Sequence, residues 1–423
     1  MAERKKLKIN STVGRKSVNM PNPTQTRAKN QKNDEFYTQW ADIEKEVQAY
    51  LEYNPNLFRG MTILCPCDDP EWSNFTKFFA LHFNDYGIKK LICTSFAPES
   101  KINKEQYQLT LFETNDPKFD ESKTRIKGKI FILDRNSGGD EKINIDNLKW
   151  EYMELDGDFR SGEVGKLYNE ADFIITNPPF SLFREFLAWI MEEKKQFLII
   201  GNMNAIAYKE VFPYIKENKV WLGATGNGSD MVFAVPKGSE VAEKDREKAA
   251  RLGYVGDYTR LGNSCWFTNI DHGRRHQPLP LMTMADNLKF SRHKEIKGKT
   301  EYDRYDNYDA IEVPFVDSIP SDYDGVMGVP ISFLDKYCPE QFLIIGLTQR
   351  GCHDEFPDTR KYNDYWEVRP DGTPTGSSGN KTNENPNLLG NDGRKNYFVN
   401  SEGRVIQSAF QRIFIKRKGA PAQ

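Results

Sequence analysis

The chain has 423 residues, of which 38% are hydrophobic and 13% aromatic, which is enough for a sizeable core and excludes disorder throughout. Its 59 basic and 61 acidic residues give a formal net charge of −2, so overall charge favours no class of partner. The 6 cysteines have no regular spacing and no apolar run reaches the ~20 residues of a membrane span, which excludes a disulfide scaffold and a membrane-spanning protein.

Residues 1–33 are basic, polar and poor in large apolar side chains. They lack the apolar segment of a secretory signal, so we expect an intracellular protein. The composition predicts a flexible basic arm. The arm can be a solvated tail without a partner, or it can be attracted to a phosphate backbone, and the sequence leaves both interpretations open.

From residue 34 to residue 236, the pattern predicts an α/β domain. Apolar residues at helical spacing predict a helix that begins near Thr38. Strand-like runs then alternate with amphipathic helical ones, which is typical of a doubly wound sheet. The expected strands are 61–67, 89–96, 129–134, 150–156, 172–177 and 196–202, and the expected helices are 71–83 and 181–195.

After residue 220 the pattern changes to short strands between Gly-rich loops, as expected of an antiparallel sheet edge or a second domain. We therefore expect residues 237–423 to form a separate, mixed α/β region. Within it, we predict loops at 302–313 and 319–330, a turn-forming segment at 369–395 and a β-prone run at 411–418.

The stretch "DFIITNPPF", Asp172–Phe180, is the most informative part of the chain. An apolar strand must end at two successive prolines, because proline cannot donate to a sheet ladder. The strand therefore leads into a stiff corner with one amide side chain and one aromatic ring. In open α/β sheets, the carboxyl ends of the strands are where ligands bind.

This corner can activate the exocyclic amino group of a nucleobase. Asn177 Oδ1 and the carbonyl of Pro178 can accept both N–H groups, while Pro179 keeps the turn rigid. Phe180 can stack on the base, which must be single-stranded or turned out of its duplex. This chemistry needs no metal and no nucleophilic side chain. The alternative is a strand-ending turn capped by asparagine.

The corner resembles motif IV of the S-adenosylmethionine-dependent amino-methyltransferases. The upstream segment "LDGDFRS" is similar to the part of that superfamily that contacts the cofactor's adenine, which implies roles for Asp158 and Phe159. The segment "NDEFYTQ" resembles motif X, near the methionine end of the cofactor. The matching residues there are Phe36, Tyr37 and Thr38.

Motif I departs from the superfamily pattern. In "ILCPCDDPEWSNF", Cys65 occupies the usual acidic position and the glycines of the turn are missing. Asp68 and Asp69 lie where an acid could bind the cofactor's amino group or ribose. We therefore include Cys65, Asp68 and Asp69 among the expected cofactor-binding residues.

A narrower resemblance covers Asp34 to Lys418. The segments that carry it are "DEFYTQ", "CDDP", "DGDFRS", "TNPPFSLFREF", "FLIIGN", "GNSCWFTNIDHGRRHQPLPL", "YDNYDAIEV", "IPSDYDGVMGVPISFL" and "RIFIK". Together they resemble the EcoRI-type adenine-N6 DNA methyltransferases. The resemblance implies a Rossmann-like class I sheet, base flipping, and methyl transfer from S-adenosylmethionine to adenine in duplex DNA.

The same resemblance implies a C-terminal target-recognition region and a cytoplasmic enzyme of a bacterial or phage-infected cell. A cognate restriction endonuclease could act on the same DNA sequence without direct contact. Two alternatives stay open. One is an amino-methyltransferase that acts on RNA guanine N2 or protein glutamine, and the other is a catalytically silent DNA-binding relative.

A basic loop comes after the strand "SCWFTNI". Arg274, Arg275 and His276 can grip phosphates or place an arginine against a guanine edge, so we expect them to bind DNA. An ordinary salt-bridged loop is the alternative. A metal site formed by Cys265, His272 and His276 is disfavoured, because their spacing matches no structural zinc pattern.

Overall fold

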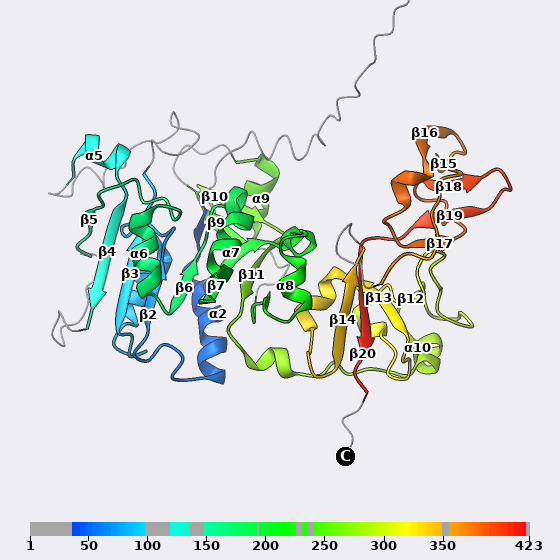
Figure 1. Cartoon of the computed structure of the whole chain (residues 1–423), viewed down its shortest axis with the longest axis horizontal. Coiled ribbons are helices and arrows are strands. Elements are labelled where there is room, and N and C mark those ends of the chain that lie inside the picture. The colour runs from blue at the N-terminus through cyan, green and yellow to red at the C-terminus, as the bar shows by residue number, and fades with distance from the viewer. Residues whose placement is uncertain are drawn as a thin grey trace, which may run out of the picture.

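The structure is a computed structural model that describes residues 36–97, 119–135, 148–192, 194–225, 231–235, 241–348 and 356–419. The expected basic arm lies outside these residues. The molecule is elongated, with one large sheet at one end and two smaller sheets at the other (Figure 1). Among the described helices, none is long and apolar enough to cross a membrane.

The large sheet is mixed and has eight strands in the order β5-β4-β3-β2-β6-β7-β11-β8. Its centre, β3-β2-β6-β7, is parallel, and antiparallel strands extend it on both sides. The strands are β2 (Thr62–Cys65), β3 (Lys90–Thr94), β4 (Lys129–Asp134), β5 (Glu151–Tyr152), β6 (Phe173–Thr176), β7 (Gln196–Asn202), β8 (Trp221–Leu222) and β11 (Ser264–Thr268). The expected α/β class and the six expected strands before residue 203 are confirmed.

Helices cover both faces of this sheet (Figure 1). Successive side chains of a strand point to opposite faces, so Ile63 of β2 joins one core cluster and Leu64 joins the other. Helices α2 (Trp40–Tyr53) and α3 (Asn74–Leu81) pack on the Ile63 side. The Leu64 side is covered by α6 (Gly162–Glu170), α7 (Phe183–Glu192) and α8 (Phe212–Lys216). This double burial explains why the interiors of the central strands are continuous apolar runs.

A three-stranded antiparallel sheet brings the first described residues to the large sheet. It consists of β1 (Tyr37–Thr38), β9 (Met231–Ala234) and β10 (Tyr258–Leu261), and α9 (Glu243–Arg251) lies between the last two in sequence. The register pairs Thr38 with Phe233. The expected helix near Thr38 therefore begins two residues later, after this short strand.

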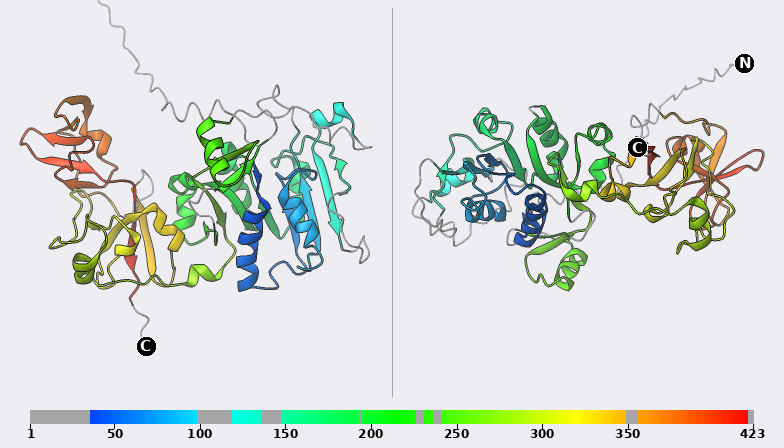
Figure 2. Two further views of the ribbon diagram at one scale, coloured as in Figure 1. Left: turned by 180° about the vertical axis from the view of Figure 1, so that it is seen from behind. Right: turned by 90° about the horizontal axis from the view of Figure 1, so that it is seen from below.

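The C-terminal half contains two further sheets (Figure 2). The four-stranded one has the order β12-β13-β20-β14 and shares its core cluster with the α7 face of the large sheet. The five-stranded one has the order β16-β15-β18-β19-β17 and a small core of its own. The elements are α10 (Met284–Phe290), β12 (Ala310–Glu312), β13 (Val326–Pro330), β14 (Phe342–Leu347), β15 (Tyr365–Val368), β16 (Pro374–Ser378), β17 (Asn387–Leu389), β18 (Tyr397–Asn400), β19 (Val405–Ser408) and β20 (Arg412–Arg417). The remaining short helix α5 (Glu121–Ile126) precedes β4.

Several expectations for this half are wrong. The predicted loops contain β12 and β13, and the predicted turn segment contains β16 and β17. The last two are edge strands of the five-stranded sheet, so each pairs with one neighbour only. Gly376 and Asn387 are residue types typical of turns, yet pairing with β15 and β19 places both segments in the sheet.

The large sheet takes one strand from beyond residue 236. Strand β11 pairs antiparallel with β7, with Cys265 opposite Gly201. A boundary at residue 236 would separate β11 from the sheet that it extends.

Candidate active site

The corner after β6 has an acceptor without a partner. Asn177 Nδ2 donates to the carbonyl oxygen of Phe36 at 2.6 Å. Because a carbonyl can only accept, this contact fixes which end of the amide is nitrogen. Asn177 Oδ1 is buried and has no hydrogen-bond partner among the described residues. A buried, unpaired acceptor is costly, which makes this atom the expected contact for a donor that arrives with a ligand.

The aromatic ring of the corner joins a cluster of three phenylalanines. The rings of Phe180 and Phe36 are stacked with centroids 5.5 Å apart. Phe233 lies edge-on, 5.8 Å from Phe36 and 6.4 Å from Phe180. Phe180 as a whole residue is half-buried. The cluster joins the motif X segment directly to the corner.

The motif X strand contributes a second buried group without a partner. Thr38 is 3% exposed, and its Oγ1 finds no hydrogen-bond partner in the described part of the chain. Its carbonyl accepts from Asn74 Nδ2 at 2.7 Å, which ties β1 to the start of α3. Tyr37 precedes it in the same strand. This orphaned hydroxyl fits a site for a polar ligand.

The loop after β2 is held by a buried carboxylate. Asp68 is 4% exposed; its Oδ1 accepts from Ser73 Oγ at 2.6 Å and its Oδ2 accepts from Thr176 Oγ1. Burial raises the pKa of Asp68 to about 7, although both hydrogen bonds act in the opposite direction. Both oxygens of this expected cofactor ligand are therefore already used within the protein.

The other expected motif I residues differ in exposure. Cys65 is the last residue of β2 and is fully buried in the core, where burial raises the pKa of its thiol. Asp69 is half-buried, and its Oδ1 accepts from the backbone N–H of Glu71 at 2.9 Å. Of the two, only Asp69 is placed where a ligand could reach its side chain.

The "DGDFRS" segment is folded into a tight loop by Gly157. This residue has a φ of +78°, and a Cβ there would lie 2.1 Å from the carbonyl oxygen of Ser95. Asp158 then accepts from Arg160 Nε at 2.9 Å and Nη2 at 2.6 Å. These hydrogen bonds lower the pKa of the Asp158 carboxyl. Burial is the main cause of the raised pKa of the Cys67 thiol, and the charge of Asp158 adds to it. Asp158 therefore lies within electrostatic range of the loop after β2.

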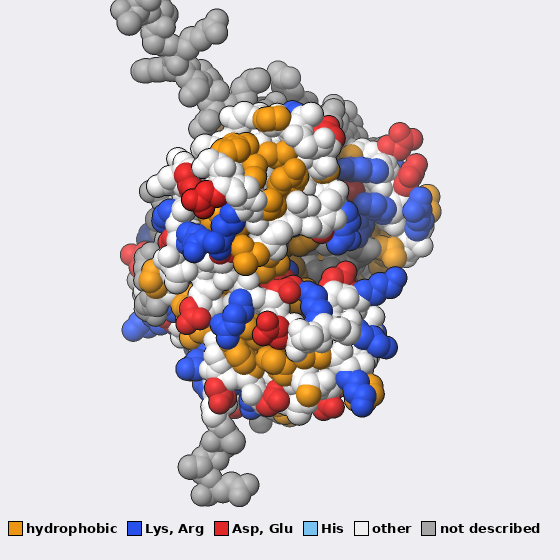
Figure 3. Space-filling model, turned by 90° about the vertical axis from the view of Figure 1, so that its right-hand side faces the viewer, with side chains coloured by type: hydrophobic (Ala, Val, Ile, Leu, Met, Phe, Trp, Pro, Cys, Tyr) orange, Lys and Arg blue, Asp and Glu red, His pale blue; other side chains and the backbone are white. Residues whose placement is uncertain are grey.

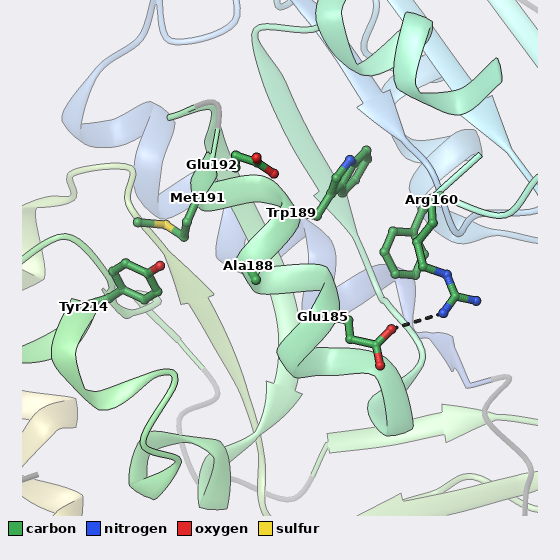
Figure 4. A pocket seen from close by; sticks show the side chains of 8 residues that line it. Arg160, Glu185, Ala188, Trp189, Met191, Glu192 and Tyr214 are labelled. Atoms are coloured by element: carbon green, nitrogen blue, oxygen red, sulfur yellow. Dashed lines mark hydrogen bonds and ion pairs between the residues drawn. The ribbon is translucent and has the colours of Figure 1, made fainter. Parts of the chain in front are cut away.

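Phe159 lies against α7. Its ring is 5% exposed and packs on Phe186 and Trp189 with centroids 5.0 and 5.5 Å away. A surface groove runs along α7 from this ring, and the Arg160–Glu185 ion pair of 3.1 Å lies at its edge (Figure 4). The α7 cluster lies on the opposite face of the sheet from the Phe36–Phe180 cluster.

The expected DNA-binding loop is tied into the protein. Arg275 is 8% exposed, lies 3.7 Å over the ring of Trp221 and forms an ion pair of 3.5 Å with Asp271. Arg274 donates at 2.6 Å both to the carbonyl of Ala224 and to Asp335. These contacts favour the alternative of a salt-bridged loop.

The two histidines of this loop also have partners within the protein. His276 lies 2.9 Å from both Asp271 and Glu340; burial lowers the pKa of His276, but the two carboxylates outweigh it and the pKa is raised. His272 is buried against the carbonyl of Leu222, and burial lowers its pKa to about 4. Across the described ranges, no group of three or more His, Cys, Asp or Glu could hold a metal ion.

Sequence reasoning missed two buried polar groups that join segments far apart in the chain. One is Thr176, which reads as an ordinary strand residue. The other is Glu46 of α2, which accepts from the backbone N–H groups of Ala224 and Thr225, each at 2.7 Å. Its position three residues after the buried Ile43 is a signal that could have found it, since helical residues with that spacing share a face.

Comparison with known proteins settles the family. The family model for the adenine-specific methyltransferase EcoRI matches residues 24–418. The chain belongs to the EcoRI family of adenine-specific methyltransferases. It is therefore an enzyme of that class, a site-specific DNA methyltransferase, as the motifs predicted.

Three relatives are similar over most of their length. The Type II methyltransferase M.EcoRI of Escherichia coli is 40% identical over 328 residues, which cover 77% of this chain and 90% of the relative. M.MpnI of Mycoplasma pneumoniae is 33% identical over 329 residues, which cover 75% of this chain and 84% of the relative. M.MgeORF184P of Mycoplasma genitalium is also 33% identical, with the same shares. No solved structure matches the chain.

Proposed function

We propose that the enzyme methylates N6 of an adenine turned out of duplex DNA, with Asn177 Oδ1 and the Pro178 carbonyl as acceptors for the amino group. The unpaired, buried Oδ1 of Asn177 carries this proposal. An amine whose two N–H bonds are both held presents its lone pair out of the ring plane, toward an electrophile. The carbonyl of Phe36 keeps the amide from rotating, so Oδ1 is oriented before the base arrives.

S-adenosylmethionine is the proposed methyl donor, and when bound it supplies an electrophilic methyl group on a sulfonium. The orphaned Thr38 hydroxyl supports a site beside motif X, together with Phe36 and Tyr37. Asp69, Asp158 and Phe159 are the proposed contacts on the adenosine side. Asp158 differs from Asp68 because its partner Arg160 is exposed and can turn away, whereas Ser73 and Thr176 are buried. Cys65 contributes packing beneath them. No proposed step uses a metal.

We infer a Rossmann-like class I methyltransferase sheet. A parallel centre with β6 between β2 and β7, and an antiparallel β11 beyond β7, supports this arrangement. The methyltransferase domain, expected to span residues 34–236, would then extend through β11. The two smaller sheets would form the target-recognition region, whose outer face mixes Lys and Arg with acidic and apolar side chains (Figure 3).

Sequencing that detects modified bases in DNA from cells expressing the chain tests the proposal. The expected result is N6-methyladenine at one short sequence, which also gives the recognition site. Methyl label that appears only in RNA or in protein would contradict it. We further expect cytoplasmic enzyme, and a cognate endonuclease, if one exists, to be blocked at the methylated sequence.

A further inference from the structure

We propose that Asp68 is a positioning residue, which fixes the catalytic corner through the hydroxyl of Thr176 and does not bind the cofactor. This inference rests on the proposed function, because it concerns the same corner. It also reassigns a residue that the sequence places among the cofactor ligands. The evidence is a buried network of hydrogen bonds that joins the ends of three structural elements.

The first connection runs to the corner itself. Thr176 is the last residue of β6, is 0% exposed and directly precedes Asn177. Its hydroxyl donates to Asp68 Oδ2 and accepts from the backbone N–H of Cys67 at 3.3 Å. The loop after β2 and the residue before Asn177 are therefore joined twice through one oxygen atom.

The second connection fixes Asp68. Its Oδ1 accepts from Ser73 Oγ, and Ser73 Oγ accepts in turn from the N–H of Phe75 at 3.0 Å as the N-cap of α3. The backbone N–H of Asp68 donates to the carbonyl of Thr94 at 2.9 Å, at the end of β3. Asp68 is thus fixed through its side chain by the N-cap of α3 and through its backbone by the end of β3, while its carboxylate accepts from Thr176 of β6.

The network replaces the missing glycines of the loop after β2. A Gly-rich turn would let the backbone pass close to a ligand, whereas this loop is fixed by a side chain. A buried carboxylate is unfavourable unless it is hydrogen-bonded, and here both oxygens accept. Asn177 is then fixed on two sides: its backbone continues from Thr176, and its amide donates to Phe36.

Chemistry at such a corner is sensitive to small displacements, since a shift of about 1 Å can lower a rate about 100-fold. Removal of the Thr176 hydroxyl in Thr176→Val keeps the side-chain shape and should slow methyl transfer in a single turnover by about 10- to 100-fold. Cofactor affinity, measured by calorimetry, should change less than about threefold if Thr176 and Asp68 touch only protein. Thr176→Ser keeps the hydroxyl and should restore the rate.

Asp68→Asn should show the same split between rate and cofactor affinity. The double variant Asp68→Asn/Thr176→Val should be no slower than the slower single variant, because both changes act on one shared contact: the first replaces its charged acceptor by an amide, and the second removes its hydroxyl donor. Thr124→Val is the matched control: it removes another buried threonine hydroxyl, which hydrogen-bonds to Tyr152 of β5, the edge strand of the large sheet. Its single-turnover rate should equal that of the parent enzyme.

Three outcomes would overturn the inference. The first is a tenfold or larger loss of cofactor affinity in Asp68→Asn while Thr176→Val keeps the cofactor affinity of the parent enzyme. The second is a rate loss in the double variant that equals the product of the two single losses. The third is a normal rate of methyl transfer in correctly folded Thr176→Val. Failure of the proposed function is a different result, because the parent enzyme itself would then leave adenine in duplex DNA unmethylated.

Discussion

The corner after β6 and the loop at 271–276 make an instructive contrast. Both concentrate polar side chains after an apolar strand, and the sequence assigns a ligand to each. In the corner, an uncharged acceptor is buried and unpaired. In the loop, each of the three basic side chains faces a carboxylate of the same chain: Arg274 faces Asp335, Arg275 faces Asp271, and His276 faces Asp271 and Glu340.

The difference shows that residue type marks possible chemistry, whereas tertiary partners decide whether the group is available. An arginine can grip a phosphate only if it is free to leave its carboxylate. An amide acceptor that is already oriented and unpaired needs no such rearrangement. Substitutions at four positions test this contrast, from the largest expected effect to the smallest.

Replacement of Asn177 by alanine should have the largest effect. Removal of one preorganised acceptor should lower the single-turnover rate by at least about 10²- to 10³-fold. Cofactor affinity, measured by calorimetry on the same preparation, should stay within about threefold. Equal loss of rate and affinity would instead place Asn177 in folding or in cofactor binding.

Glu46 offers an intermediate case, a buried acid whose acceptors are all used. Burial raises its pKa from 4.5 to about 7. The folded state therefore binds the Glu46 proton more tightly than the unfolded state does. The resulting contribution to the free energy of unfolding is complete below pH 4.5 and is lost as the pH rises to about 7.

The stability advantage of the parent enzyme over Glu46→Gln should consequently shrink between pH 5 and pH 8, by on the order of 3 kcal/mol. Urea unfolding of both proteins at the two pH values measures it. Glu44→Gln is the control, because Glu44 is exposed on the same helix. An advantage that grows with pH would show that the sign of the Glu46 pKa shift is wrong.

Phe180→Ala should weaken binding of DNA with a mismatched target base by about 1–3 kcal/mol, the usual contribution of one base–aromatic stack. Phe180→Tyr keeps the ring and should bind as the parent does. Fluorescence titration with a labelled duplex gives both affinities. If Phe180→Ala loses thermal stability but binds DNA normally, the ring serves only the cluster with Phe36 and Phe233.

Arg275→Ala should have the smallest effect on DNA binding. The slope of log affinity against log salt concentration should stay unchanged, whereas loss of a phosphate contact would reduce it by about one. Thermal stability should fall by about 1–2 kcal/mol, because Trp221 loses its cation. A reduced salt slope would show that the loop rearranges to bind DNA.

The large sheet could be predicted well because its strands are marked locally. Buried parallel strands such as β2, β6 and β7 are short apolar runs. The helices between them are marked by apolar residues that recur at helical spacing. The edge strands β16 and β17 could not, because their residues favour turns and only pairing with β15 and β19 places them in the sheet.

The sequence by itself determined the corner, since two prolines after an apolar strand stop the ladder wherever the strand lies. Only the tertiary structure decided which groups are available there. Asp68 and Asp69 are adjacent and identical in type, yet the Asp68 carboxylate accepts from the hydroxyls of Ser73 and Thr176, whereas the Asp69 carboxylate accepts from the backbone N–H of Glu71. Burial and hydrogen bonding depend on elements far apart in the chain, and a linear pattern does not specify which of them will meet.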